Sequence, residues 1–379
     1  MKMCAVRYAG TLLEGGAVEF EVDNGVITRV TPIKDSSSLP WIMPVLVDLQ
    51  QNGAVGHTFS TLQSPEELRA ITETLYRHGV GRVQATTVSV PVERLTASLQ
   101  IIARECASDP VLDKVIFGLF HEGIFMSFEE GWRGDHDLEC IRKPDWDLFR
   151  KIDDASGNRF TTVNVAPEVE GAMEFISQAV KGGKKVSLGH CNPSTAEIRE
   201  AVKRGADRVT HFANGAAPLL HRFKNPFWEF LNNPGLKLGL ICDGFHLPPE
   251  TVSVAMKLKG KSACLVVSDA SGFSGLKPGI YGNGKRILEP NGFLHVIGKD
   301  ILAGSSCQQN TCVNFLMQKL DFSFIDAWRQ CSLIPAASLG IKLPEIKVGE
   351  EASFVICREE NNAAVIDRTV IMGTEYPFA

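Results

Sequence analysis

The sequence has few of the features that mark membrane-spanning, secreted or nucleic-acid-binding proteins. No apolar run reaches the ~18 to 20 residues that a bilayer span needs, and the first residues lack the apolar core of a signal peptide. The formal net charge of −5 means that the protein lacks the positive electrostatic potential needed to bind nucleic acids or anionic membranes. We therefore expect a cytoplasmic protein with no nucleic-acid or membrane partner, in which any anionic ligand is met by local groups.

Cysteine is present, but not in the spacing of disulfide frameworks or zinc motifs. Ten cysteines are scattered over 379 residues, and no two form a C-x-x-C pair. In a chain of this length without a secretion signal, such cysteines are expected to be reduced and mostly buried, where they pack as small hydrophobic side chains.

From residue 44 onward, short β-branched runs alternate with helical patterns, which is typical of parallel βαβ units. The first strand-to-helix turn, LQQNGAVGHT, is not the G-x-G-x-x-G of a dinucleotide-binding sheet. Eight such units favour a closed (β/α)8 TIM barrel. The helix STAEIREAVKRG opens with a capping-box pattern. The expected strands are 44–50, 82–88, 115–122, 160–167, 184–190, 207–213, 236–243 and 263–269.

The two ends of the chain have a different pattern. Residues 1–43 and 343–379 are rich in strand and turn signals, and Asn24-Gly25 predicts a hairpin. We expect these segments to pair into a small β-sandwich domain, while residues 44–342 form the barrel domain.

Polar residues follow most of the expected strands. In a (β/α)8 barrel the active site lies at the carboxyl ends of the strands, so these side chains are expected to meet in one pocket. A glutamate and two histidines from three strands match the ligand set of a catalytic divalent metal, and an aspartate could accept a proton from metal-bound water. The polar residues at the strand ends are Gln50, Asn52, Glu122, Asn164, Glu168, His190, His211, Asp243, His246 and Asp269.

Each of these residues also has a purely structural interpretation. A histidine at a strand end is more often a hydrogen-bonded structural residue than a metal ligand. Asp269 could cap the helix that follows it. The combination on one face of one barrel is what favours a site.

In order and spacing, these segments resemble the amidohydrolase superfamily and, within it, the N-acetylglucosamine-6-phosphate deacetylase family. The resemblance covers nearly the whole chain. It implies a homodimeric, metal-dependent hydrolase that removes the N-acetyl group of an amino-sugar 6-phosphate. The segments that carry it are VDLQQNG, HEG, APE, GHCN, THFANGAAPLLHR, CDGFH, SDA, GSS and IPAASLGI.

Position by position, the resemblance implies that Glu122, His190 and His211 bind one divalent metal ion, zinc or iron. Asp269 matches the catalytic base, and His136 matches the histidine that polarises the carbonyl group. Related enzymes place a His-x-His pair where this chain has Gln50 and Asn52, so a second metal is not expected. The positions implied to contact substrate are Gln50, Asn52, Asn214, Gly215, His246 and Arg222, the last reaching in from the neighbouring subunit of a dimer.

Departures from the family pattern leave the substrate open. The family's His-Leu-Glu-Gly-Pro is FHEGI here, its Arg-Glu-Pro-Gly is RFKN and its Asn-Ala-Met is NGA. An enzyme for N-acetylgalactosamine 6-phosphate, or for another acylated amino sugar, would fit as well.

Two alternatives of other classes remain at this stage. One is a different metal hydrolase on the same scaffold, although such enzymes commonly bridge two metals with a lysine on the fourth strand and FTTVNVAP has none. The other is an inactive binding paralogue. Retention of Glu122, His190, His211 and Asp269 together argues against inactivity.

Overall fold

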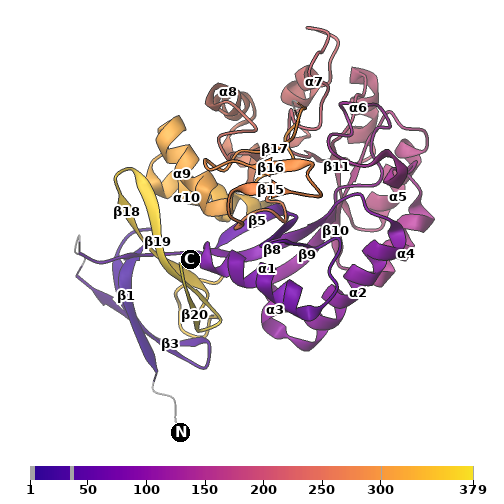
Figure 1. Cartoon of the computed structure of the whole chain (residues 1–379). Coiled ribbons are helices and arrows are strands. Elements are labelled where there is room, and N and C mark those ends of the chain that lie inside the picture. The colour runs from indigo at the N-terminus through magenta and orange to yellow at the C-terminus, as the bar shows by residue number, and fades with distance from the viewer. Residues whose placement is uncertain (1–4, 35–37, 300, 379) are drawn as a thin grey trace. The chain divides into compact units, whose positions relative to one another are not determined.

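The computed structural model describes residues 5–34, 38–299 and 301–378. These residues form an eight-stranded parallel barrel with helices, and a separate, mostly antiparallel sheet from the two ends of the chain (Figure 1). The expected fold class is therefore confirmed. Within the described ranges, no helix is both long and apolar enough to cross a membrane.

All eight expected strands belong to the barrel. Neighbouring strands follow the order of the sequence, from β5 to β14. Between the ends of these two strands, the backbone N–H of Asp269 donates to the carbonyl of Gln50 (2.9 Å), and that of Asn52 donates to the carbonyl of Ala270 (2.8 Å). The polar ends of the first and last strands are thus held together. The strands are β5 (Leu46–Gln51), β8 (Val80–Thr87), β9 (Ile116–His121), β10 (Phe160–Val165), β11 (Lys185–Leu188), β12 (Arg208–Val209), β13 (Lys237–Ile241) and β14 (Cys264–Val267).

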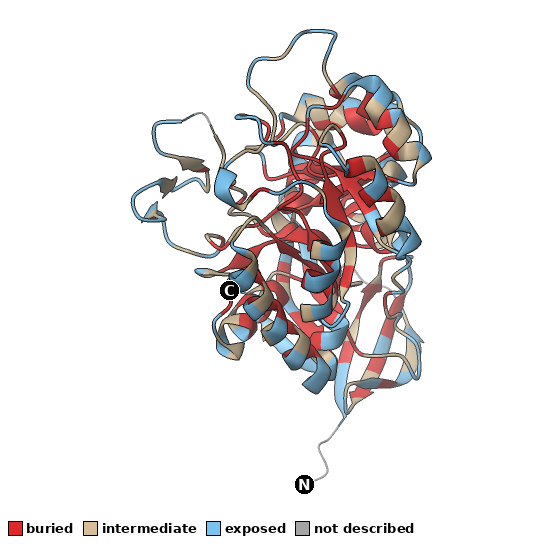
Figure 2. Cartoon of the chain, turned by 90° about the vertical axis from the view of Figure 1, so that its right-hand side faces the viewer, coloured by how far each residue is buried: buried red, intermediate tan, exposed pale blue. Residues whose placement is uncertain are grey.

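Helices alternate with these strands, and Figure 2 shows the strands buried while the outer helix faces are exposed. The capping box expected in STAEIREAVKRG is present, because the Ser194 side chain accepts from the Glu197 backbone N–H and the Glu197 side chain accepts in return. The helices are α1 (Pro65–Arg77), α2 (Val92–Ser108), α3 (Pro110–Val115), α4 (Trp146–Ala155), α5 (Ala172–Lys181), α6 (Thr195–Lys203), α7 (Phe227–Asn232), α8 (Pro249–Lys259), α9 (Gln309–Leu320), α10 (Phe324–Cys331) and α11 (Leu333–Ser338).

An aromatic layer packs strands β9 and β10 against α4 and α5. The rings of Phe149, Phe160 and Phe175 lie 5.8–5.9 Å from their neighbours, measured between ring centroids. The fully buried His121 ring joins this layer, 5.4 Å from Phe160. Successive residues of a strand point to opposite faces. Because His121 points into the helix layer, the next residue, Glu122, points into the barrel.

The ends of the chain form one seven-stranded sheet in the order β20-β19-β18-β4-β1-β2-β3. Its core is aromatic, with the rings of Tyr8, Phe20 and Phe354 5.1–5.5 Å apart. The predicted hairpin joins β2 to β3, and both Asn24 and Gly25 have positive φ, as this type of turn requires. The strands are β1 (Val6–Leu12), β2 (Ala17–Asp23), β3 (Val26–Ile33), β4 (Trp41–Met43), β18 (Phe354–Glu360), β19 (Ala363–Ile371) and β20 (Thr374–Pro377).

The chain divides into two compact units. The domain boundaries expected at residues 43 and 343 stay a prediction, and residues 1–4 and 379 of the expected terminal domain lie outside the described residues. All residues of the candidate site belong to the second unit. The first unit is Met1–Asp48, Thr72–Val83 and Gln308–Ala379, and the second is Leu49–Ile71 and Gln84–Cys307.

Candidate active site

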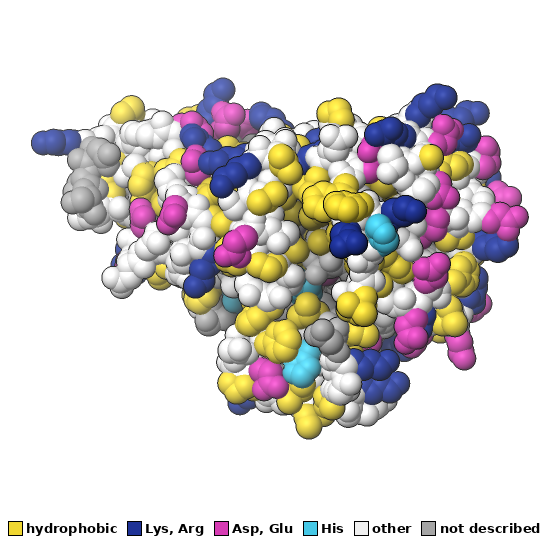
Figure 3. Space-filling model, turned by 90° about the horizontal axis from the view of Figure 1, so that it is seen from above, with side chains coloured by type: hydrophobic (Ala, Val, Ile, Leu, Met, Phe, Trp, Pro, Cys, Tyr) yellow, Lys and Arg dark blue, Asp and Glu magenta, His cyan; other side chains and the backbone are white. Residues whose placement is uncertain are grey.

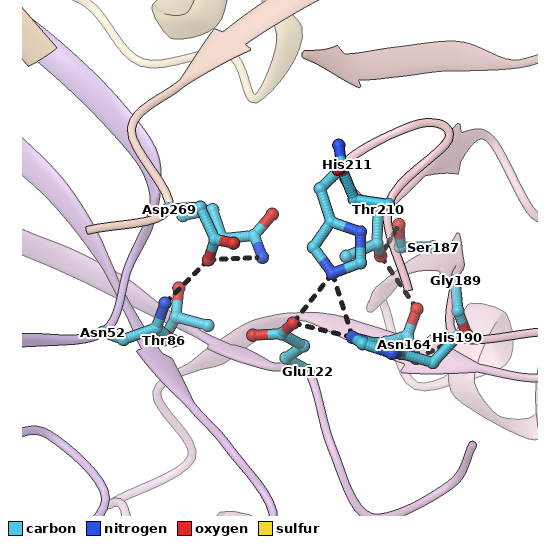
Figure 4. Close-up of polar contacts among 12 residues, drawn as sticks. Asn52, Thr86, Glu122, Asn164, Ser187, Gly189, His190, Thr210, His211 and Asp269 are labelled. Atoms are coloured by element: carbon cyan, nitrogen blue, oxygen red, sulfur yellow. Dashed lines mark hydrogen bonds and ion pairs between the residues drawn. The ribbon is translucent and has the colours of Figure 1, made fainter. Parts of the chain in front are cut away.

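Three side chains from three strand ends converge on one point (Figure 4). The Nε2 atoms of His190 and His211 are 2.9 Å apart. They lie 3.1 Å and 3.0 Å from Oε1 of Glu122. All three side chains are buried. The structure therefore brings together the three residues that the sequence suggested as metal ligands.

The electrostatics of this triangle favour an ionised carboxylate. Burial by itself would raise the pKa of Glu122, but hydrogen bonds from His190 and His211 hold it well below its usual range. Burial lowers the pKa of His190. A negative oxygen thus faces two imidazole nitrogens among largely buried side chains.

The donor set fits a divalent metal ion. Zinc–nitrogen and zinc–oxygen bonds of ~2.0–2.2 Å in a tetrahedral site place ligand atoms ~3.3 Å apart, close to the spacing in this triangle. Nδ1 of His190 lies 3.1 Å from the backbone carbonyl of Trp132. With a metal ion in place of the Nε2 contact to Glu122, Nδ1 would carry the proton and donate to that carbonyl, which would leave the Nε2 lone pair for the metal. One carboxylate and two imidazoles also leave a coordination position open, as a catalytic site requires.

The backbone at the site is strained. His190, His211 and Asp269 have φ of 52°, 28° and 50°, in the left-handed region that residues other than glycine seldom adopt. Each lies two residues beyond the last residue of its strand. Such conformations cost about 1–3 kcal/mol each and persist only where the surroundings enforce them. These backbone conformations are therefore enforced by the tertiary structure of the barrel and not by the local sequence.

Two glycines enclose the His190 ring. A Cβ atom on Gly215 would lie 2.5 Å from Nδ1 of His190, and one on Gly134 would lie 3.3 Å from its Cε1. Only glycine at position 215 lets the backbone approach the ring this closely. Gly215, which the resemblance implied as a substrate-binding position, also positions His190.

Asp269 is fixed by two amide side chains. Nε2 of Gln50 donates to Oδ1 of Asp269 at 3.0 Å, and Nδ2 of Asn52 donates to the same oxygen at 2.7 Å. Among the described residues both bonds reach Oδ1, so Oδ2 is the oxygen that can take up a proton. Burial, together with the negative charge of Glu122, raises the pKa of Asp269 to about 7. A carboxylate with this pKa is suited to proton transfer near neutrality.

His136 lies beside the triangle, on a loop rather than a strand. One of its ring nitrogens is within 4.8 Å of the ligand atoms of Glu122 and His190. Burial lowers its pKa to about 3, so the imidazole is neutral and keeps one N–H donor. The adjacent Asp135 accepts two hydrogen bonds from Arg286 of strand β16 (Arg286–Leu288), at 2.5 and 2.8 Å. This ion pair ties the His136 loop to the small sheet that follows β14.

The remaining predicted residues lie outside the triangle. The backbone N–H of Asn214 donates to the carbonyl of His211 (2.9 Å), and its side-chain Nδ2 donates to the carbonyl of Phe212 (3.3 Å). His246 is bonded through Nδ1 to Asp243 (2.7 Å) and is near enough to Asp269 to lower that residue's pKa. Arg222 is exposed and packs over the Phe223 ring.

Some features of the site carry no sequence signal. The Trp132 carbonyl that orients His190 is a backbone group, which any residue would supply. The contact of Arg286 with Asp135 joins residues 151 positions apart. Gly134 has a φ of 60°. This conformation is a property of the folded chain, so nothing in the sequence indicated its role beside His190.

No family model matches the chain. It is 27% identical over 325 residues to the N-acetylglucosamine-6-phosphate deacetylase of Bacillus subtilis, a match that covers 83% of this chain and 80% of the relative. It is also 27% identical over 342 residues to the N-acetylgalactosamine-6-phosphate deacetylase of Escherichia coli O157:H7, covering 89% of each.

The fold has a counterpart among solved structures. An N-acetyl-D-glucosamine-6-phosphate deacetylase mutant from Mycobacterium smegmatis, in complex with N-acetyl-D-glucosamine-6-phosphate, superposes with a TM-score of 0.84 at 22% identity. The match covers 99% of this chain and all of that one. By sequence the chain is a homologue of N-acetylglucosamine-6-phosphate deacetylases, and solved structures of such enzymes share its fold.

Proposed function

We propose that this protein hydrolyses the N-acetyl amide of an amino-sugar 6-phosphate, with N-acetylglucosamine 6-phosphate as the principal substrate. The observation that carries the proposal is the triangle of Glu122, His190 and His211 in one barrel mouth with Asp269, whose pKa is raised to about 7. The products are the amino-sugar 6-phosphate, which now carries a free amine, and acetate.

The three residues of the triangle would hold one zinc or iron ion. Such an ion would lower the pKa of a water molecule at the site and would polarise the amide carbonyl. Glu122 contributes negative charge, and the two imidazoles contribute neutral nitrogen donors, a set that suits either metal. Gln50 and Asn52 are engaged with Asp269 by hydrogen bonds, which supports a single-metal site.

Asp269 acts first as base and then as acid. Its Oδ2 takes the proton from the attacking water, while Oδ1 stays fixed by the two amides. The same oxygen then delivers that proton to the nitrogen of the departing amine, because an amine leaves only when protonated. His136 donates its N–H to the carbonyl oxygen as negative charge develops there.

The phosphate group would be held by Arg222 of a second subunit, with Asn214, Gly215 and His246 contacting the sugar. Arg222 lies in the exposed loop before α7, which reaches the top of Figure 1. Hydrophobic side chains gather beside basic ones on this upper face (Figure 3). Leu219 and Phe223 are 90% and 74% exposed there, a degree of exposure that supports burial against another copy. A guanidinium suits a phosphate dianion because it donates two parallel hydrogen bonds.

N-acetylgalactosamine 6-phosphate is the second candidate substrate. The Escherichia coli relative named for that sugar matches this chain at the same identity as the Bacillus subtilis one. The two sugars differ only in the configuration of one hydroxyl group, which leaves the amide, the phosphate and the metal chemistry unchanged.

A deacetylation assay tests the proposal. We expect zinc- or iron-loaded protein to release acetate from one or both 6-phosphates, and chelator-treated protein to be inactive until metal is restored. The unphosphorylated N-acetyl sugars should be much poorer substrates. Absence of acetate release from both phosphorylated sugars by metal-loaded protein would contradict the proposal.

Arg222→Ala tests the phosphate anchor in the same assay. Loss of a charge-assisted hydrogen-bond pair of about 1.5–3 kcal/mol is expected to raise KM for the phosphorylated sugar roughly 10- to 100-fold, with little change in kcat. Lys224→Ala, which removes another exposed cation from the same loop, is the matched control and should leave KM unchanged. Equal effects of the two changes, or a KM unaltered in Arg222→Ala, would rule out this anchor.

A further inference from the structure

Asn164, a buried residue of β10, touches the strand ends that carry both histidines of the triangle. Its Nδ2 donates to the backbone carbonyl of Gly189 (3.1 Å), the residue before His190. Its Oδ1 accepts from the hydroxyl of Thr210 (2.8 Å), the residue before His211. One amide therefore joins the peptide carbonyl before His190 to the side chain of the residue before His211, as Figure 4 shows.

The surroundings leave this amide little freedom. Ser187 and Thr210 are joined through their hydroxyl groups at 2.6 Å; since the Thr210 proton is given to Asn164, Ser187 is the donor. A Cβ atom on Gly189 would lie 2.5 Å from Cβ of Thr210 and 2.8 Å from Oδ1 of Asn164. The three strand ends β10, β11 and β12 are therefore locked together by side chains just below the triangle.

The hydrogen bonds of Asn164 help to hold the strained backbone of the two histidines in place. His190 and His211 both have positive φ, and a residue keeps such a conformation only where its neighbours enforce it. Asn164 holds the carbonyl of the peptide that precedes His190 and the side chain of Thr210, the residue that precedes His211. An amide is the side chain that can do this, because it carries a donor and an acceptor on one rigid group, whereas a carboxylate has no donor and a leucine has neither.

We propose that Asn164 is a positioning residue for the metal site: by bridging Gly189 and Thr210 it sets the separation and orientation of His190 and His211. This inference rests on the proposed metal site, although not on the identity of the substrate. Groups that orient metal ligands at one remove typically contribute a factor of about 10–100 to metal affinity.

The test is Co²⁺ binding to chelator-treated protein, measured by competition with a chromophoric chelator and by the visible absorption of bound Co²⁺, which reports ligand geometry. Asn164→Leu is expected to weaken Co²⁺ binding about 10- to 100-fold and to change the absorption spectrum. Neither readout depends on catalysis.

Gln84→Leu is the matched control. Gln84 is a buried amide of strand β8 that donates to the hydroxyls of Thr161 and Thr162, at 2.6 and 2.7 Å, so its loss also removes two hydrogen bonds from the barrel interior. Those bonds do not reach the residues before the histidines. We expect a lowered melting temperature in both variants, but wild-type Co²⁺ affinity and spectrum in Gln84→Leu.

If Asn164→Leu does not fold, Thr210→Val tests the same inference, because it keeps the shape of the side chain and removes the hydroxyl that donates to Asn164. It should shift the spectrum in the same direction and weaken binding by a smaller factor. Wild-type Co²⁺ affinity and spectrum in the folded variants would overturn the inference, as would a wild-type protein that binds no Co²⁺. A wild-type protein that binds Co²⁺ but deacetylates neither sugar would overturn the proposed function alone.

Discussion

Asp269→Asn is expected to lower kcat by about 10²- to 10⁴-fold, the range that a positioned proton-transfer group contributes. The change is nearly isosteric. The remaining oxygen can still accept from Gln50 and Asn52, so only the proton-accepting atom is lost. Metal content should be unchanged, because the close contacts of the triangle do not include Asp269. The measurement is kcat at saturating substrate beside metal content for both proteins.

The pH profile separates this role from a structural one. In the wild-type protein, activity requires the ionised carboxylate, so kcat/KM should fall as the pH drops through the pKa of Asp269. Burial and Glu122 raise that pKa from 3.8 to about 7, and a bound cation would lower it again, so the acidic limb should lie between those values. The residual activity of Asp269→Asn should lack this limb. A variant with kcat within tenfold of the wild type, or with the same limb, would contradict the assignment.

Gly215→Ala is expected to reduce both metal affinity and kcat/KM by about 10²-fold, although it adds one methyl group. The new Cβ would lie 2.5 Å from Nδ1 of His190, so the ring or the loop must move. A displacement on the order of 1 Å in a catalytic constellation can cost this much. Zinc affinity by competition and steady-state kinetics are the two measurements.

Gly183→Ala is the matched control for the backbone. Gly183 also has positive φ, 78°, but a Cβ there would meet nothing within 4 Å. Both variants carry the conformational cost of alanine in the left-handed region, and only Gly215→Ala disturbs His190. Wild-type metal affinity in Gly215→Ala, or an equal loss in Gly183→Ala, would show that the contact with His190 does not matter.

The strand ends of the site could be predicted because barrel geometry makes them meet. Glu122, His190, His211 and Asp269 follow four β-branched runs, and parallel strands with crossover helices bring the carboxyl ends of such runs to one face. The eight strands appear where the sequence placed them, although β12 is only Arg208–Val209. The alternation of β-branched runs with helical patterns identified the strands. The polar residue after each run identified the end of the barrel that carries the site.

The contacts around these residues could not be predicted in the same way. The expected contact of Gln50 and Asn52 with substrate stays a prediction. Their hydrogen bonds to Asp269 could not be predicted, because this pairing depends on the closure of the barrel. His136 lies on a loop without strand or helix pattern, so only the family resemblance pointed to it. Asn164 looked like any polar residue on a strand, because its two partners come from neighbouring strands.

Metal content of the purified protein tests the central claim most directly, because every proposed step depends on one cation shared by a carboxylate and two imidazoles. The account predicts one equivalent of zinc or iron in the wild-type protein, one equivalent in Asp269→Asn, and a large loss in Glu122→Gln and His211→Asn. A Glu122→Gln protein that is folded and still holds one tightly bound equivalent would contradict it, as would wild-type protein that binds neither metal.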